Sequence, residues 1–231
     1  MQVSLTAGSL AAGSLAGDPA AAPLLTRIET RPGAVVWLVR HGETEWNAQR
    51  RLQGQHDSPL TPRGQRQALA IADLLARTLG KRPPVRLVSS PLGRTRATMA
   101  PIAAALDLPV DYDPRLMEIG LGAWEGMTWD EIEAAFPGAL DGATSHERFF
   151  RPPGGETHAA MMARLGGWLA EVDGPTIAVS HGFSGRVLRG LYGGLDPLAA
   201  LDQPQPQDGL FCLRDGDMEF LQAMLEDDLG N

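Results

Sequence analysis

The sequence contains little cysteine, no long apolar run and no excess of positive charge, and each absence excludes a class of protein. Cys212 is the single cysteine among 231 residues, so neither an intrachain disulfide nor a cysteine-based metal cluster can form. A chain without disulfides suits a reducing compartment, and we predict a cytoplasmic location. No apolar run approaches the length that crosses a bilayer, so we expect no membrane partner.

Acidic residues outnumber basic residues in this chain. The 28 Asp and Glu residues against 20 Lys and Arg residues give a formal net charge of −8. Binding along a phosphate backbone needs a basic face, so we expect no nucleic-acid partner. A local basic pocket is still compatible with an acidic protein, and such a pocket would select small anions.

The first 33 residues differ in composition from the rest of the chain. They are rich in Ala, Gly, Ser and Leu and have no basic residue before Arg27. A secretion signal starts with positive charge, so we do not interpret this segment as one. We predict a flexible extension over residues 1–33, or alternatively an added helix that packs on the domain or on a partner subunit. Residues 34–231 then form one domain.

Beyond residue 33, short apolar runs alternate with longer amphipathic stretches. The short runs predict strands over residues 34–39, 85–89, 109–112 and 176–180. An Asp-Gly turn between residues 209–213 and 218–222 predicts a closing hairpin. We expect helices over residues 62–79, 93–106, 155–172 and 184–192, and a loop or lid over residues 137–155. Strands that alternate with helices predict an α/β fold, a three-layer α/β/α sandwich around a mainly parallel sheet.

The polar segment after the first predicted strand carries the strongest chemical signal. A cation, an imidazole and a tight-turn glycine stand side by side in the run Arg40-His41-Gly42-Glu43-Thr44-Glu45-Trp46-Asn47. Ligand sites in open α/β sheets lie at the carboxyl ends of strands. Arg40 and His41 are therefore well placed to bind a phosphoryl group and then attack it.

Two further strand ends carry residues of the same kind. Arg94 follows strand 85–89 at the start of a predicted helix, where free backbone N–H groups favour anions; alternatively, Arg94 and Arg96 form a solvated helix face. His181-Gly182 follows strand 176–180 and repeats the His-Gly pair. If these strands are parallel, His41 and His181 lie on the same rim of the sheet.

A fourth segment supplies a carboxyl group. Glu118 lies in an apolar, glycine-rich loop, where burial would let it hold a proton near neutral pH and give it to a leaving alkoxide. Glu125, in the same loop, is the competing candidate.

In this order, the four segments resemble the histidine phosphatase superfamily, which includes the cofactor-dependent phosphoglycerate mutases. The resemblance covers residues 35–221. It depends on RHGETEWN at 40–47, GQHDSPLT at 54–61, SSPLGRTRAT at 89–98, GAWEG at 122–126 after Glu118, and VSHG at 179–182.

The resemblance implies roles for single residues. His41 matches the nucleophile of the family and Glu118 its proton donor. The resemblance assigns the phosphate pocket of the family to Arg40, Arg94 and a protonated His181. It assigns contacts with substrate or phosphate to Asn47, Thr44 and Gly54. The Glu156-Thr157 pair matches a helix start that either caps its helix or faces the site, and no metal or other cofactor is implied.

Two departures from the mutases favour hydrolysis. Mutases of the family carry a longer, basic insertion between the acid and the second histidine, whereas this interval holds only Arg148, Arg151 and Arg164 as basic residues. Trp129 stands where the mutases have a lysine. We expect a phosphatase that acts through a phosphohistidine on a small phosphorylated metabolite and releases inorganic phosphate. The alternatives are mutase-type isomerisation and a catalytically dead module that binds a phosphorylated ligand.

The sequence leaves the substrate and the oligomeric state open. Five aromatic residues form either a wall for the leaving group or part of the core and the lid: Trp124, Trp129, Phe136, Phe149 and Phe150. Four arginines either bind a second carboxylate or phosphate on the substrate or simply face solvent: Arg50, Arg51, Arg63 and Arg151. A homodimer through the N-terminal extension or the closing hairpin is a further hypothesis.

Overall fold

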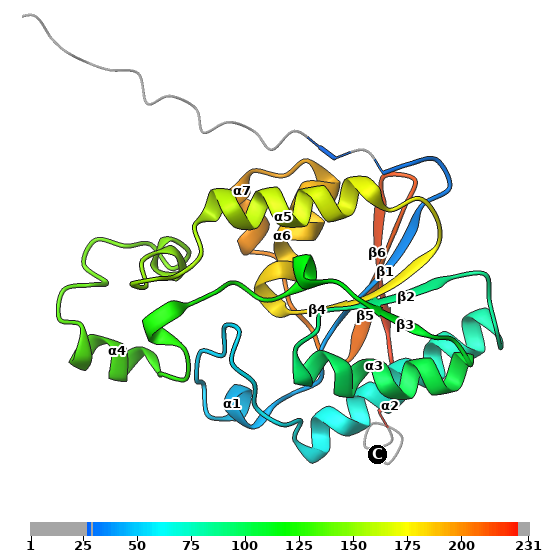
Figure 1. The fold of residues 1–231 in the computed structure, drawn as a ribbon, viewed down its shortest axis with the longest axis horizontal. Helices are drawn as coiled ribbons and strands as arrows, with labels where there is room; N and C mark the ends of the chain where they lie inside the picture. Colours follow the sequence, from blue (N-terminus) through cyan, green and yellow to red (C-terminus); the bar gives the residue numbers. More distant parts are fainter. Residues whose placement is uncertain (1–26, 29, 226–231) are drawn as a thin grey trace, which may run out of the picture.

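A single mixed sheet forms the centre of the computed structural model, which describes residues 27–28 and 30–225 (Figure 1). Its strands are β1 (Val35–Arg40), β2 (Arg86–Ser89), β3 (Val110–Tyr112), β4 (Thr176–Ser180), β5 (Gly209–Arg214) and β6 (Asp217–Gln222). They lie in the order β3-β2-β4-β1-β5-β6. The first four of these pair in parallel, and β5 and β6 are antiparallel. The mainly parallel sheet with an added hairpin agrees with the prediction.

Helices cover both faces of the sheet. α2 (Pro62–Leu79) and α3 (Gly93–Leu106) lie together on one face. The opposite face is covered by α5 (His158–Glu171) and α6 (Gly182–Gly193), and the short α7 (Pro197–Leu201) packs on α6. The chain is therefore an α/β protein with three layers, as predicted.

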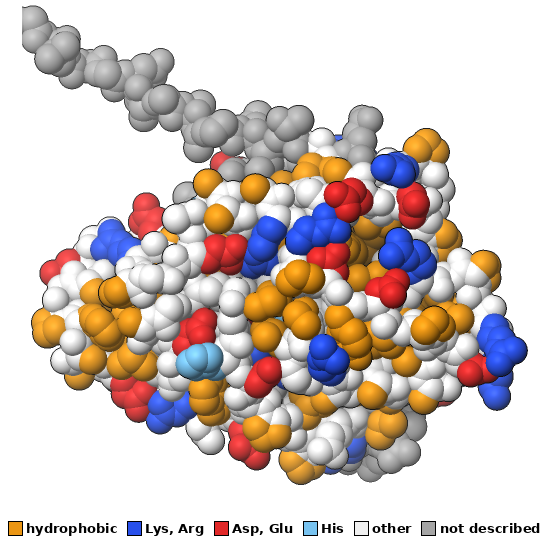
Figure 2. Space-filling view, in the orientation of Figure 1, with side chains coloured by type: hydrophobic (Ala, Val, Ile, Leu, Met, Phe, Trp, Pro, Cys, Tyr) orange, Lys and Arg blue, Asp and Glu red, His pale blue; other side chains and the backbone are white. Residues whose placement is uncertain are grey.

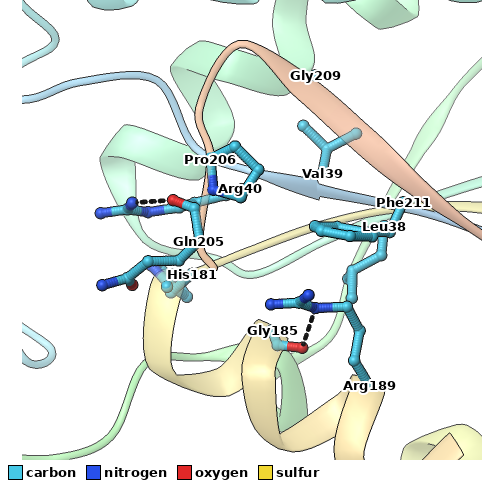
Figure 3. A pocket seen from close by; sticks show the side chains of 11 residues that line it. Leu38, Val39, Arg40, His181, Gly185, Arg189, Gln205, Pro206, Gly209 and Phe211 are labelled. Atoms are coloured by element: carbon cyan, nitrogen blue, oxygen red, sulfur yellow. Dashed lines mark hydrogen bonds between the residues drawn. The ribbon is translucent and has the colours of Figure 1, made fainter. Parts of the chain in front are cut away.

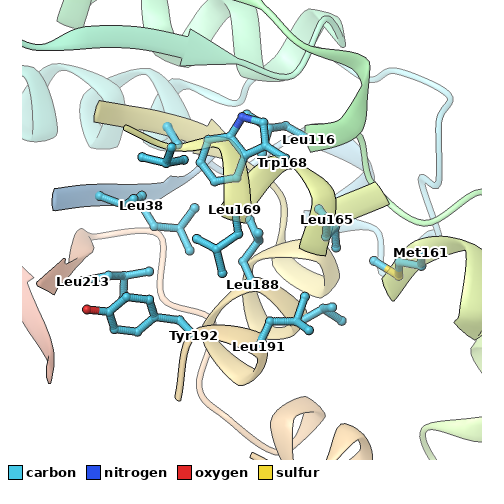
Figure 4. Close-up of a cluster of buried hydrophobic side chains, with 14 of the residues drawn as sticks. Leu38, Leu116, Met161, Leu165, Trp168, Leu169, Leu188, Leu191, Tyr192 and Leu213 are labelled. Atoms are coloured by element: carbon cyan, nitrogen blue, oxygen red, sulfur yellow. The ribbon is translucent and has the colours of Figure 1, made fainter. Parts of the chain in front are cut away.

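The two faces of the sheet enclose two separate apolar cores. Along β1, Val36 and Leu38 belong to the core under α5 and α6, whereas Val39 belongs to the core under α2 and α3. Figure 4 shows the first core, where Leu38 lies near Trp168 of α5 and Leu188 of α6. Side chains on a strand alternate between faces, so a central strand buried on both faces reads as a continuous apolar run.

Capping residues mark the start and the end of the long helix α2. Thr61 caps α2 by accepting a hydrogen bond from the Gly64 amide, Pro62 occupies the first turn, and Gly80 ends the helix with φ of +74°. Three short helices were missing from the prediction: α1 (Glu45–Ala48), α4 (Trp129–Ala135) and α7. They are too short to show an apolar period. Single 3₁₀ turns are η1 (Pro114–Leu116), η2 (Gly122–Trp124) and η3 (Glu147–Phe150), the last inside the predicted 137–155 loop.

Most of the predicted N-terminal extension lies outside the described residues. Of the described part, Ile28 packs against the α5–α6 core and donates its amide to the Leu191 carbonyl at 3.0 Å. In the part of the chain that the structure describes, no helix is both long and apolar enough to span a bilayer.

Candidate active site

The carboxyl ends of three parallel strands bring the predicted histidines together. β2, β4 and β1 are neighbours in the sheet, and their ends lie at one edge. His41 follows β1 and His181 follows β4, and the centroids of their rings are 5.2 Å apart. Arg94, in the first turn of α3 after β2, donates from Nε to His181 Nδ1 at 3.1 Å. The two His-Gly segments therefore meet on one rim, as predicted.

The protonation state of His41 follows from a single hydrogen bond. Its Nδ1 lies 2.8 Å from the carbonyl oxygen of Gly42, which can only accept, so Nδ1 carries the proton and Nε2 keeps a lone pair. Burial, followed by the charges of Arg94 and Arg40, lowers the pKa of His41 well below its usual range. The ring is thus neutral, with Nε2 available as a nucleophile.

The prediction of a protonated His181 is wrong for the structure as it stands. Its Nδ1 accepts from Arg94, so that nitrogen carries no proton, and its Nε2 lies 2.8 Å from the hydroxyl of Ser90. Burial, followed by the charges of Arg94 and His41, lowers the pKa of His181 well below its usual range. A neutral ring that donates from Nε2 satisfies both contacts.

Arg94 is held almost entirely by protein groups. Its guanidinium donates to the carbonyls of His56 at 2.6 Å and Gly54 at 2.7 Å, besides His181. It also forms an ion pair with Asp57 at 3.0 Å, and its side chain has no exposed surface. Four of the five N–H groups of an arginine are used in this way, which leaves one Nη2 hydrogen for a ligand. Arg94 is therefore not a solvated helix residue.

Arg40, the last residue of β1, lines the same small hollow as His181 and Gln205 (Figure 3). It donates to the backbone carbonyl of Gln205, and its Nε is buried without a hydrogen-bond partner among the described residues. Burial lowers its pKa to about 10, despite the nearby carboxylate of Glu118. Arg40 thus remains charged at neutral pH, with an unused donor.

The glycines of the two His-Gly segments are required by crowding rather than by a turn. A Cβ on Gly42 would lie 2.4 Å from the carbonyl oxygen of Gly64, at the start of α2. A Cβ on Gly182 would lie 2.1 Å from Oε1 of Gln205 and 3.1 Å from Nε of Arg40. Neither residue has a positive φ, and the backbone over 41–43 forms no turn, so the expected tight turn at Gly42 is absent.

Glu118 lies among hydrogen-bond donors, which differs from the apolar setting that the sequence suggested. Its Oε1 accepts from the amide of Ser184 at 2.9 Å and the amide of Ile119 at 3.2 Å. The hydroxyl of Ser184 lies 3.0 Å from the same oxygen and shares its one hydrogen with the closer Met117 carbonyl, at 2.7 Å. Oε2 of Glu118 accepts from the amide of Phe183 at 3.0 Å. The N-terminus of α6 thus holds the carboxyl group in place, with Oε2 as the less occupied oxygen.

Four of the five predicted catalytic residues border one cavity of about 180 Å³. Its polar lining includes Arg40, His41, Arg94 and Glu118, together with the predicted ligands Asn47 and Gly54. His181 borders an adjoining small hollow on the other side of Arg40 instead (Figure 3). The structure therefore gathers all but His181 and Thr44 of the predicted site residues around the same space.

Thr44 and Asn47 form a capping box at the start of α1. The Thr44 hydroxyl accepts from the Asn47 amide at 3.1 Å, and the Asn47 side-chain oxygen accepts from the Thr44 amide at 3.2 Å. Thr44 is fully buried and does not border the cavity. Because the oxygen of Asn47 is occupied, its NH₂ group is the part that can donate to a ligand.

Glu125, the competing acid candidate, holds a loop instead. Its Oε1 accepts from the amides of Gln55 at 2.8 Å and Leu121 at 3.0 Å, and the residue does not border the cavity. A Cβ on Gly54 would lie 2.2 Å from the same oxygen. Glu125 therefore fixes the segment whose Gly54 carbonyl binds Arg94.

Arg164 and Glu156 form a clamp that sequence reasoning did not foresee. The Arg164 guanidinium donates to the carbonyls of Arg115 and Met117, each at 2.7 Å, and of Glu118 at 3.3 Å. Its Nε and Nη2 pair with both oxygens of Glu156, at 2.6 and 2.8 Å. Thr157 caps α5, so the Glu156-Thr157 pair combines a helix cap with a hold on the Glu118 loop.

A polar segment between α7 and β5 closes one side of the site, which sequence reasoning also missed. Gln207 donates to the His41 carbonyl at 2.9 Å and to the Asn47 side-chain oxygen at 3.3 Å. The only sequence signal there is a Gln-Pro-rich stretch over 203–207, which is typical of a linker.

The aromatic residues divide between the core and the cavity. Trp124 is fully buried and packs edge-on against Trp129, with centroids 6.2 Å apart. Phe149 borders the cavity and packs on Phe183, at 5.0 Å. The predicted lid thus contributes one aromatic ring to the site.

Known proteins resemble this chain over most of its length. A relative from Salmonella paratyphi C, named "Probable phosphoglycerate mutase GpmB", is 38% identical over 154 residues, which is 64% of this chain and 70% of the relative. The structure of a mycobacterial glucosyl-3-phosphoglycerate phosphatase, in its complex with VO3, is 27% identical with a TM-score of 0.62 and covers 83% of this chain and 98% of that chain. Bacillus stearothermophilus YhfR is 28% identical with a TM-score of 0.68, covering 84% and 96%.

Residues 36–216 match the family model described as histidine phosphatase superfamily, branch 1. The match includes both His-Gly segments, Arg94 and Glu118, which the fold brings to one edge of the sheet. The chain therefore belongs to the histidine phosphatase superfamily.

Proposed function

We propose that this protein hydrolyses phosphomonoesters of small metabolites through a phosphohistidine, without a metal ion. The observation that carries the proposal is the common cavity of His41, Arg40, Arg94 and Glu118. A nucleophile, two cations and a carboxyl group are the parts that phosphoryl transfer by positioning and charge stabilisation needs.

In the first step, His41 Nε2 attacks phosphorus while the ester P–O bond breaks. The unused Nε of Arg40, the remaining Nη2 hydrogen of Arg94 and the NH₂ group of Asn47 donate to the phosphoryl oxygens. Glu118 gives a proton to the leaving oxygen, and Oε2 is the oxygen with room for that proton. His181 orients Arg94 through Nδ1 and reaches the phosphoryl group only if its Nε2 leaves Ser90.

In the second step, water replaces the leaving group. The Glu118 carboxylate takes a proton from this water, which attacks phosphorus as the P–N bond to His41 breaks. Inorganic phosphate leaves, and both residues return to their starting states.

The positions of the basic residues between Glu118 and His181 favour hydrolysis over the mutase reaction. Arg148 stacks on Trp129, at 3.9 Å from the ring centroid, and Arg151 donates to the carbonyl of Asp141 at 2.8 Å. Arg164 belongs to the clamp described above, and none of the three borders the cavity. A mutase must retain and rebind its product, and these residues are occupied elsewhere.

The named relatives support both chemistries. One carries the name of a mutase and another that of a phosphatase, and both names contain phosphoglycerate. We therefore include a phosphoglycerate among the test substrates.

The decisive experiment measures phosphate release in excess EDTA, with wild-type protein beside His41→Ala. The substrates are p-nitrophenyl phosphate, 3-phosphoglycerate, sugar phosphates and nucleotides. We expect EDTA-resistant release that falls more than about a hundredfold in His41→Ala, as for other removed nucleophiles. A ³²P-labelled ester should also label the wild-type protein with a phosphoryl group that mild acid removes. The absence of this label from His41→Ala would identify it as the phosphohistidine.

The alternatives give different results in the same assay. Isomerisation of 3-phosphoglycerate faster than phosphate release would identify a mutase. Binding of vanadate without turnover of any ester would identify a binding module.

A further inference from the structure

One arginine in the cavity has no role in the chemistry proposed above. Arg186 lies on α6 and borders the same space as His41 and Glu118. It donates from Nη1 to the carbonyl of Leu201. Its Nε is buried and has no hydrogen-bond partner among the described residues, and no bond from Nη2 is found there. A buried donor without a partner costs stability, which a ligand can restore.

The carboxylates near Arg186 do not satisfy it. Glu118 is close enough to act on its charge, but the oxygens of Glu118 already accept from α6 and from Ile119. Asp202 also lies nearby, and pairs with His146 at 3.2 Å. Within the described part of the chain, neither carboxylate forms an ion pair with Arg186.

The other cavity arginines are already committed. Arg51 makes a two-fold contact with Glu131, at 2.6 and 3.0 Å, and Arg94 pairs with Asp57. Arg40 is placed for the phosphoryl group. The sequence-based suggestion that Arg50, Arg51, Arg63 or Arg151 meets a second acidic group is not supported. Neither Arg50 nor Arg63 borders the cavity, Arg63 lies near Glu43, and Arg151 binds backbone carbonyls.

The free edge of Arg186 has a defined geometry. With Nη1 bound to Leu201, the Nε and Nη2 hydrogens remain, and these two point the same way in a planar guanidinium. Such a fork matches the two oxygens of a carboxylate. Phe183 lies beside it, with the guanidinium carbon 5.2 Å from the centre of the ring, and Phe149 and Ile119 are further apolar residues of the same cavity.

We propose that Arg186 binds a carboxylate on the leaving group, so that the enzyme prefers phosphoesters of hydroxy acids over phosphoesters of neutral alcohols. This rests on the proposed phosphatase function. The phosphoryl group would occupy the His41 end of the cavity and the carboxylate the Arg186 end, with the connecting carbon atoms against Phe183.

The test compares 3-phosphoglycerate with glycerol 3-phosphate, which differ in a carboxylate against a hydroxymethyl group. We expect wild-type kcat/KM to be about tenfold or more higher for the acid, as for one charge-assisted contact. In Arg186→Gln the ratio should fall to near one, mainly through KM, whereas Arg186→Lys should keep part of it. Arg51→Gln, which removes a cavity arginine already paired with Glu131, should keep the full ratio.

Each outcome of this experiment decides something. A wild-type ratio near one, or a ratio unchanged in Arg186→Gln, overturns the proposal. Equal losses on both esters in Arg186→Gln and Arg186→Lys also overturn it, since they assign Arg186 to structure or to the chemistry. If the Gln variant does not fold, the competition of 3-phosphoglycerate against p-nitrophenyl phosphate is measured in the wild type and Arg186→Lys. Failure of the wild type to hydrolyse any ester rejects the phosphatase function itself and is distinguishable from these results.

Discussion

The surroundings of Glu118 and His41 differ in a way that suits the complementary tasks proposed for them. His41 is buried beside two cations, which keeps it neutral, and the Gly42 carbonyl selects the tautomer with a free Nε2. Glu118 is only half-buried and accepts hydrogen bonds from the start of α6. A carboxyl group held this way is fixed in position, and it borders the cavity within which the proposed proton transfer would occur.

Replacing Glu118 should therefore affect substrates according to their leaving groups. In Glu118→Gln we expect kcat/KM to fall by about 10²–10⁴ for alkyl phosphates, which need a proton on the departing oxygen. The loss should be much smaller for p-nitrophenyl phosphate, because p-nitrophenolate departs without protonation. Steady-state kinetics on both esters measures the difference.

Glu125→Gln serves as the matched control for that prediction. Glu125 holds the Gly54 loop and does not border the cavity. Its replacement should lower both rates by the same factor. Equal losses on both esters in Glu118→Gln would contradict its role as the acid.

Among the elements of the fold, α5 holds the loop that carries Glu118, the proposed acid. Arg164 binds the backbone carbonyls of Arg115, Met117 and Glu118. It also pairs with Glu156, and both side chains are mostly buried, with 17% and 14% exposed. The amide of Glu156 also donates to the carbonyl of Gly120 at 2.7 Å. The clamp therefore connects the start of α5 to the position of the acid.

Arg164→Met should impair catalysis by letting Glu118 move from its position. We expect kcat/KM for alkyl phosphates to fall about tenfold or more relative to p-nitrophenyl phosphate, since small displacements of a catalytic group are costly. Arg164→Lys should recover little, because a single ammonium cannot reproduce the planar fork. In the Glu118→Gln background the added effect of Arg164→Met on alkyl phosphates should vanish, and additive effects would assign Arg164 to stability alone.

The segment after β1 and the first turn of α2 are in direct contact, which constrains two glycines. Gly42→Ala places a Cβ 2.4 Å from the backbone of Gly64, so we expect a loss of about 1–3 kcal/mol in the free energy of unfolding. Gly167→Ala on α5 is the control, because nothing lies within 4 Å of its Cβ. That variant should gain about 0.5–1 kcal/mol from helix propensity. Urea unfolding of both variants measures these changes, and a stable Gly42→Ala would contradict the described contact.

At the scale of the whole molecule, burial of two histidines makes stability depend on pH. The pKa values of His41 and His181 are lowered in the folded state, so the unfolded state binds more protons below about pH 6.5. Their contribution is thus complete above pH 6.5 and is lost as the pH falls toward the folded-state values.

We expect the free energy of unfolding to fall below pH 6.5 by up to about 1.4 kcal/mol per pH unit for each of these histidines. Urea unfolding between pH 7.5 and pH 5 measures the slope, in a range above the titration of ordinary carboxylates. His41→Asn should reduce the slope by one proton. A slope that is the same in wild type and His41→Asn would refute the neutral, buried state of His41.

The charge distribution bears on the partners that the sequence suggested. Figure 2 shows Lys and Arg side chains interspersed with Asp and Glu side chains on one face of the molecule. Arg86 and Asp111, at 3.3 Å, and Arg115 and Asp113, at 2.8 Å, are pairs of this kind. The absence of a nucleic-acid partner, the cytoplasmic location and the homodimer remain predictions.

The sequence by itself determined the class of fold, the long elements and the residues at the ends of the strands. Apolar runs buried on both faces, a Thr-Pro helix start and His-Gly segments are local patterns, so they can be read without coordinates. The short helices could not be found from periodicity, although Thr44 and Thr128 carry capping boxes that signal two of them.

Only the tertiary structure decided which polar groups meet. The neutral state of His181 depends on Arg94, which is 87 positions away in the chain, and the donors around Glu118 come from α6. The Arg164 clamp, the unpaired edge of Arg186 and the contact of Gln207 with the His41 carbonyl are likewise long-range. Hydrogen bonds and desolvation act through space, so protonation states and free donors depend on neighbours that sequence spacing does not reveal.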